Sequence, residues 1–105
     1  MESINRIELR GRVGRIKREQ VGDNEVARIS LGVESASRTF VGASIVHTDW
    51  FNIVAWKGGK VNFDAVTDNS IIYVVGAMKM RHYRADGADH YSPEVVASEL
   101  KWEGR

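Results

Sequence analysis

Cysteine is absent from the 105 residues of this chain, and proline occurs only once, at Pro93. Without thiols, the sequence excludes a disulfide scaffold, a thiolate zinc site and a cysteine nucleophile. Long apolar runs are also missing, because none approaches the roughly 20 residues that a bilayer-spanning helix needs. Glu2 and Glu8 lie where a targeting leader would be basic. We therefore expect a cytoplasmic protein with no membrane association.

The chain also lacks an excess of charge of one sign. Fifteen Lys and Arg residues oppose 14 Asp and Glu residues, which gives a net charge of +1. Overall charge therefore does not indicate a nucleic-acid-binding protein. The cations are concentrated in the first eighteen residues, at Arg6, Arg10, Arg12, Arg15, Lys17 and Arg18. This cluster predicts either a locally basic surface or a charged strand edge that discourages aggregation.

The length and composition are typical of one small globular domain. Hydrophobic residues make up 43% of the chain and charged residues 28%, which is not the composition of a disordered segment. A chain of this size can bury a sizeable core. We expect a single domain over residues 1–105.

Alternating apolar residues divide the chain into five predicted strands, at residues 4–18, 25–33, 49–56, 70–83 and 90–100. The small, polar stretch 35–48 predicts a long flexible loop, and residues 60–68 form the only predicted helix. Five strands with one short helix between the third and fourth is the element order of the OB-fold, an all-β, five-stranded Greek-key barrel. Gly11 and Gly14 favour this fold, because its long first strand must bend to pair with neighbours on both sides.

The third predicted strand has two faces, and both are largely apolar. Phe51, Ile53 and Ala55 lie on one face, whereas Trp50 and Trp56 lie on the other. If the first face is inside, two tryptophans lie on the outer surface about 20 Å apart along the strand. Exposed aromatics suit nucleobase stacking, since every base has a π-face. The alternative is that a second subunit or the helix covers them.

The fourth predicted strand repeats this arrangement, with Lys79, Arg81 and Tyr83 together on one face. Cations interleaved with an aromatic can engage phosphates and a base at the same time. Phe40, in the predicted loop, is a further candidate for base contact. Alternatively, Phe40 attaches the loop to the barrel.

No arrangement of side chains in the sequence indicates catalysis. His82, Asp86 and His90 are spaced by four residues, but ordinary surface histidines explain them better than a metal site does. No glycine-rich phosphate loop leads from a strand into a helix, and no base and carboxylate accompany the serines. We therefore expect no catalytic residue, no metal site and no cofactor, and a protein that is not an enzyme.

Segments of all five predicted strands match those of one known family. The chain resembles the bacterial single-stranded DNA-binding proteins, the SSB family, and residues 48–56 (TDWFNIVAW) are the most specific match. The other matching segments are residues 5–14, 26–31, 73–76 and 81–83, and Tyr91 with 94–96. The likeness covers nearly the whole chain in the right order.

The resemblance implies an OB-fold protomer that binds single-stranded DNA without sequence preference in replication, recombination or repair. It also implies a homotetramer, with a dimer as the alternative. Trp50, Trp56 and Tyr83 match the stacking aromatics of the family, and Arg81 and His82 match a basic pair. The expected nucleic-acid-binding residues are Trp50, Trp56, Tyr83, Phe40, Arg10, Arg12, Asn52, Lys57, Lys79, Arg81 and His82.

The chain departs from the family pattern at four places. A family aromatic after the second strand is replaced by Ser37, with Phe40 as a candidate substitute. Phe51 occupies a histidine position associated with subunit contacts, and Asp68-Asn69 replaces a lysine-glycine pair. The sequence ends at Arg105 without the family's acidic tail. We therefore expect no tail-mediated recruitment of repair or replication proteins, as in a truncated chain or a short family member.

Two other functions use the same features. An OB-fold adaptor or assembly subunit of a primosome or conjugation complex would cover the aromatic surface with a protein partner. Protein interfaces are also enriched in Trp, Tyr and Arg, so composition does not decide between these functions. RNA binding through the same surface is the third possibility, since stacking platforms serve both polymers.

Overall fold

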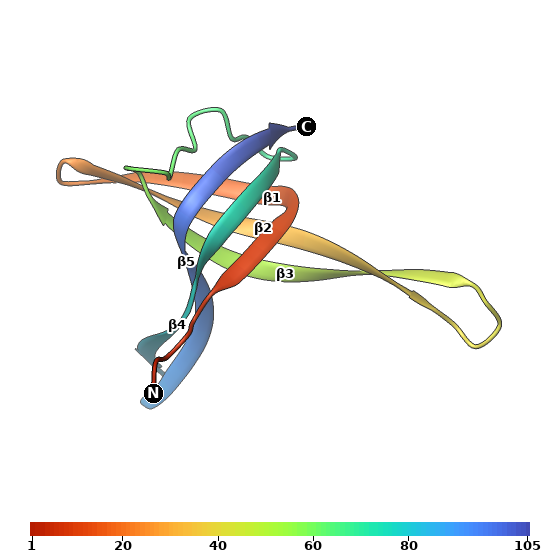
Figure 1. The fold of residues 1–105 in the computed structure, drawn as a ribbon. Coiled ribbons are helices and arrows are strands. Elements are labelled where there is room, and N and C mark those ends of the chain that lie inside the picture. The colour runs from red at the N-terminus through yellow and green to blue at the C-terminus, as the bar shows by residue number, and fades with distance from the viewer.

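The computed structural model describes residues 1–105 as five long strands that form a closed barrel in the order β1-β2-β3-β5-β4 (Figure 1). The strands are β1 (Ile7–Val21), β2 (Asn24–Arg38), β3 (Ser44–Trp56), β4 (Ile71–Ala85) and β5 (Ala88–Gly104). The expected all-β, five-stranded barrel is confirmed. The structure contains no helix that could span a lipid bilayer.

Strand β1 bends so that it can pair with two neighbours. Residues 7–12 pair with β4 and residues 12–21 pair with β2, and the register shifts between Val13 and Arg15. The strands come very close at this bend, because a β-carbon at Gly11 would lie 2.3 Å from the carbonyl oxygen of Gly32. Only glycine permits that approach. The predicted kink in the first strand is therefore confirmed.

The inner faces of the strands form one core. In β3, Ile53 and Ala55 are buried and Phe51 packs against them. Trp50 and Trp56 point outward, with 61% and 45% of their surfaces exposed. The structure thus selects the first of the two arrangements that the sequence left open for this strand.

The predicted helix at residues 60–68 is wrong. The connection between β3 and β4 consists of turns, and its apolar residues Val61, Phe63 and Val66 are buried against the barrel. Arg18 fixes the connection by donating hydrogen bonds to the carbonyl oxygens of Phe63 (2.8 Å) and Val66 (2.6 Å). The Asn62 side chain also accepts a local backbone hydrogen bond, which competes with helical pairing.

The predicted flexible loop at residues 35–48 is also wrong over most of its length. Strand β2 continues to Arg38 and β3 begins at Ser44, so the two strands pair throughout and only residues 39–43 form the connection. The β-branched residues of this segment favour strands. Apolar and polar residues alternate only weakly here, because both faces of this two-stranded arm are exposed to solvent.

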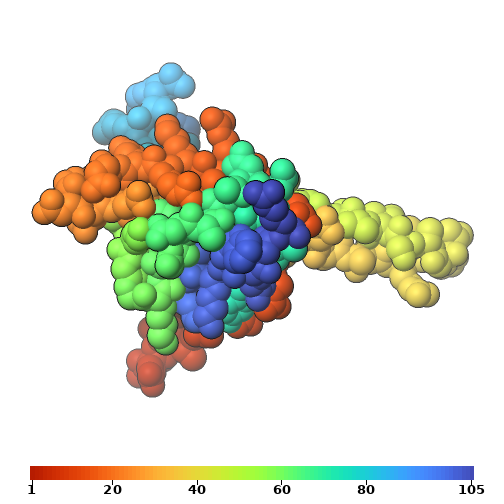
Figure 2. Space-filling view, turned by 90° about the horizontal axis from the view of Figure 1, so that it is seen from above, coloured from red at the N-terminus to blue at the C-terminus, as the bar shows by residue number.

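Paired strands extend beyond the barrel on several sides (Figure 1). The β2–β3 arm projects furthest, and it stands clear of the body in the view from above (Figure 2). The β4–β5 arm turns at Asp86 and Gly87, both of which have a positive φ. These arms raise the radius of gyration to 15.9 Å, compared with about 13 Å for a compact chain of this length.

Candidate nucleic-acid interface

The outer face of β1, β2 and β3 carries rows of side chains that lie opposite one another across the strands. Trp56 is opposite Val26 at one end, and Trp50 is opposite Gly32 at the other. Directly opposed residues of antiparallel strands share a face. Two rows lie between the tryptophans. The row nearer Trp56 consists of Lys17, Arg28 and Val54, and the row nearer Trp50 consists of Arg15, Ser30 and Asn52.

The Trp50 ring reaches over glycines of β1 and β2. A β-carbon at Gly14 would come within 2.6 Å of the Trp50 ring, and one at Gly32 within 3.0 Å. The missing side chains of these two glycines therefore make room for the indole. Part of the ring is held against the sheet, and the exposed remainder is available to a ligand.

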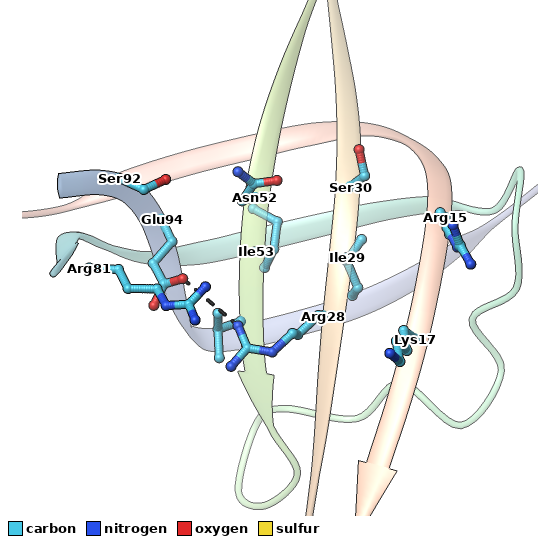
Figure 3. A pocket seen from close by; sticks show the side chains of 11 residues that line it. Arg15, Lys17, Arg28, Ile29, Ser30, Asn52, Ile53, Arg81, Ser92 and Glu94 are labelled. Atoms are coloured by element: carbon cyan, nitrogen blue, oxygen red, sulfur yellow. Dashed lines mark ion pairs between the residues drawn. The ribbon is translucent and has the colours of Figure 1, made fainter. Parts of the chain in front are cut away.

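A shallow groove of about 450 Å³ crosses this face (Figure 3). Arg15 and Lys17 line it from β1, Arg28 and Ser30 from β2, Asn52 from β3, Arg81 from β4, and Ser92 and Glu94 from β5. All five strands thus contribute a polar or charged side chain.

The groove is strongly basic. Its only acidic side chain is Glu94, which lies 3.9 Å from Arg28, and Figure 3 draws this ion pair across the groove. Arg15, Lys17 and Arg81 form no ion pair within the chain. A polyanion can therefore approach three unpaired cations without first displacing a carboxylate.

A smaller cleft of about 210 Å³ opens from the groove where β3 and β5 diverge. Its walls include Trp50 on one side and Pro93 on the other, and Phe51 and Met78 also line it. The cleft shares Asn52, Ser92 and Glu94 with the basic groove. The space beside the Trp50 indole is thus continuous with the basic groove that the cations line.

The two faces of the β4–β5 arm each carry a pair of His and Tyr rings. Tyr83 stacks on His90 with ring centroids 5.3 Å apart, on the face that also holds Arg81. His82 and Tyr91 lie on the opposite face, with centroids 5.0 Å apart. His82 is also 3.3 Å from Asp89. Of the expected basic pair, Arg81 thus lines the groove and His82 faces away from it.

Three of the expected phosphate-binding cations are engaged within the chain. The Arg10 guanidinium pairs with Glu103 at 2.6 Å, and this hydrogen bond raises the pKa of Arg10 and lowers that of Glu103. Arg12 donates to the carbonyl oxygen of Asn69 at 2.7 Å. Lys57 pairs with Asp64 at 2.6 Å, which raises the pKa of the lysine. None of the three lines the basic groove.

The remaining expected residues lie at the edges of this surface. Phe40 is fully exposed at the tip of the β2–β3 arm, and it does not attach that segment to the barrel. Lys79 lies opposite Glu94 on the β4–β5 arm, outside the groove.

Arg15, Lys17 and Arg28 line the groove but were not among the expected binding residues. Arg15 and Lys17 belong to the basic cluster within the first eighteen residues. Arg28 alternates with the core residues Ala27 and Ile29, which marks it as pointing outward. All three are identified once the register of β1, β2 and β3 is known, because that register places them in the rows between Trp50 and Trp56.

The fold resembles those of three solved structures. The Plasmodium falciparum SSB, solved in complex with ssDNA, aligns with a TM-score of 0.79 and 24% identity over 98% of this chain and 97% of that one. The small single-stranded DNA-binding protein from Streptomyces coelicolor aligns with a TM-score of 0.73 and 20% identity over 98% and 96%.

The third is a deletion mutant of the single-stranded DNA binding protein from Thermus aquaticus. It aligns with a TM-score of 0.78 and 19% identity over 97% of this chain, which spans about half (52%) of that protein. No protein of curated function matches the chain. A model of the single-strand binding protein family matches residues 4–102. The chain therefore belongs to the single-strand binding protein family.

Proposed function

We propose that this chain binds single-stranded DNA without sequence preference along the outer face of β1, β2 and β3, in replication, recombination or repair. The family is one of DNA-binding proteins and not of enzymes. The observation that carries the assignment to this face is the basic groove between two exposed tryptophans.

Bases would stack on Trp50 and Trp56. The two residues are six positions apart on β3, which separates them by about 20 Å and leaves room for bases between them. The Trp50 ring already lies against Gly14 and Gly32. Because this contact limits the positions of the ring before binding, less side-chain entropy is lost when a base stacks on it.

Phosphates would bind the cations between the tryptophans. Four basic side chains line the groove: Arg15, Lys17, Arg28 and Arg81. If the three without an ion pair, Arg15, Lys17 and Arg81, each neutralise one phosphate, the logarithm of the affinity falls with the logarithm of the salt concentration with a slope of about −2, at about 0.7 per phosphate. The cations that already hold partners within the chain would contribute less, and these are Arg28, Arg10, Arg12 and Lys57.

The two arms would extend the contact beyond the barrel. Tyr83 lies on the same face of the β4–β5 arm as Arg81 and would stack a further base. Phe40 would do the same from the tip of the β2–β3 arm. In this proposal, residues 1–105 form one DNA-binding domain. The chain assembles as a homotetramer and acts in the cytoplasm.

A tryptophan-fluorescence titration with a long oligothymidylate, at low and at moderate salt, tests this function. We expect strong quenching that saturates at a fixed number of nucleotides per subunit and that weakens with salt. Matched DNA and RNA oligomers compared side by side test the preference for DNA. Absence of quenching, together with absence of a mobility shift at low salt, would refute the proposal and favour the adaptor role.

A further inference from the structure

A second groove lies on another part of the surface, at one end of the barrel. It has a volume of about 470 Å³ and lies between the C-terminal end of β5 and the connection that follows β3. Trp102 and Lys101 line it from β5, and Lys60, Asn62 and Asp64 line it from the connection. The corresponding chain segments lie side by side in the view from above (Figure 2).

Trp102 is held in place beside this connection. The backbone N–H of Leu100 donates to the carbonyl oxygen of Lys60 at 3.0 Å, and Leu100 also forms a β-bridge with Val61. Leu100 is buried in the core, whereas Trp102, two residues further along, is 48% exposed. The strand therefore carries an aromatic ring past the end of the core and leaves about half of its surface free.

The groove begins close to the end of the proposed DNA-binding face. Gly59 lines it and is only three residues after Trp56. Three residues of extended chain span at most about 11 Å. A nucleic-acid strand that stacks a base on Trp56 and continues past the end of β3 would therefore meet Gly59 and Lys60 next.

The charges in this groove favour a phosphate. The acidic Asp64 is already paired with Lys57 at 2.6 Å, and Lys101 is paired with Glu99 at 3.3 Å. Lys60 has no ion pair within the chain and remains as the free charge. An unpaired lysine beside an exposed indole can bind a nucleotide, with the base on the ring and the phosphate on the ammonium group.

We propose that the groove of Trp102 and Lys60 is a second contact site for the same DNA strand, occupied by nucleotides that extend beyond Trp56. The proposal rests on the proposed function of the β1–β3 face. It predicts that short DNA binds the first face alone and that longer DNA reaches both sites. A protein partner on Trp102 is the competing occupant that the experiment must exclude.

The test compares two DNA lengths, chosen from the range of about 4–16 nucleotides that one OB fold binds. The affinities of the wild-type chain, Trp102→Ala and Lys60→Glu are measured for oligothymidylates of about 5 and about 16 nucleotides. Arg6→Glu is the control, since it makes the same charge change at a residue that lines neither groove. Circular dichroism establishes that each variant is folded.

We expect Trp102→Ala to lose at least about fivefold in affinity for the long oligomer, the lower limit for one stacked base. Lys60→Glu should lose a similar amount, because it replaces a phosphate-binding cation with an anion. Their affinity for the short oligomer should stay within about twofold of wild type. Lys60→Glu keeps the proposal testable if Trp102→Ala does not fold, because Lys60 is exposed.

Three results distinguish the failure of this inference from that of the proposed function. If the wild type binds both oligomers and Lys60→Glu binds the long one as tightly, the second site is wrong and the first stands. An equal loss on the short and long oligomers would also overturn the second site. If the wild type binds neither oligomer, the proposed function itself fails.

Discussion

The indole of Trp50 lies directly over Gly14, so close that a β-carbon at Gly14 would be 2.6 Å from the Cζ3 atom of the ring. Gly14 belongs to β1 and Trp50 to β3, and β2 lies between them. The register shift of β1 occurs at this glycine. One small residue therefore both bends the first strand and makes room for the aromatic ring.

Replacing Gly14 with Ala should displace the Trp50 ring and weaken DNA binding severalfold. The clash is with an exposed side chain that can swing away, so the free energy of unfolding should change by about 1 kcal/mol or less. Affinity for oligothymidylate and urea denaturation are the measurements. The control is the same substitution in a Trp50→Ala background, where no ring remains to be displaced. An equal loss of affinity in both backgrounds would contradict this mechanism.

Removing either tryptophan of the β1–β3 face should cost about tenfold or more in affinity, because a stacked base contributes about 1–3 kcal/mol. Trp50→Ala and Trp56→Ala are compared with Tyr91→Ala. Tyr91 is an exposed aromatic on the face of the β4–β5 arm that points away from the groove. The assignment fails if both tryptophan variants stay within twofold of wild type.

The salt dependence of binding should separate the free cations from the paired ones. Lys17→Ala should reduce the log–log slope by about 0.7, because one phosphate contact is lost. Arg10→Ala should leave the slope nearly unchanged, since its guanidinium is occupied by Glu103. Titrations at several salt concentrations measure both slopes. A larger effect at Arg10 than at Lys17 would move the phosphate path to the half of β1 that pairs with β4.

The connection between β3 and β4 should be a part of the core that stabilises the fold. Phe63→Ala should lower the free energy of unfolding by about 3–5 kcal/mol, because the ring is fully buried. Phe40→Ala should change it by less than about 0.5 kcal/mol, because that ring is fully exposed. Urea denaturation of the two variants makes a matched comparison. Similar stabilities would show that the connection is only loosely attached.

The Arg10–Glu103 pair should contribute to stability only above acidic pH. Its hydrogen bond lowers the pKa of Glu103 below the ordinary value of 4.5, so the folded state favours the ionised carboxylate. That contribution is present above pH 4.5 and disappears as the pH falls through the lowered pKa. Wild type should therefore exceed Glu103→Gln in stability at pH 7, and the two should converge in acid. A difference that persists at pH 2 would contradict this assignment.

The sequence predicted the barrel because alternation is a local signal. Wherever one face of a strand packs on the core, as at Ile53 and Ala55, apolar and polar residues alternate and the strand can be recognised. The β2–β3 arm gives no such signal, since Ile45 and Val46 are both exposed. A strand that is solvated on both faces looks like a loop in the sequence.

The missed helix and the missed groove residues have a different cause. Residues 60–68 are shaped by contacts from a distant strand, because Arg18 holds the carbonyl groups of Phe63 and Val66. Likewise, Lys17 and Arg10 are both cations on the same strand, and they are separated by the strand that each faces and by the ion pair that Arg10 forms. Glu103 pairs with Arg10 and is far away in the sequence. Such pairings depend on the tertiary structure and have no local signature.

The barrel closes through a short seam, where β3 and β5 pair in parallel only at Ile53 with Val95 and Val54 with Val96. The other seams are antiparallel and longer. Transient opening of the barrel should therefore begin here, and the amide protons of this seam should exchange with solvent before those of β4. Ile53 and Val54 of this seam also line the basic groove. A bound DNA strand that crosses the seam would hold β3 and β5 together. Binding should therefore slow the exchange of these amide protons and also raise the melting temperature.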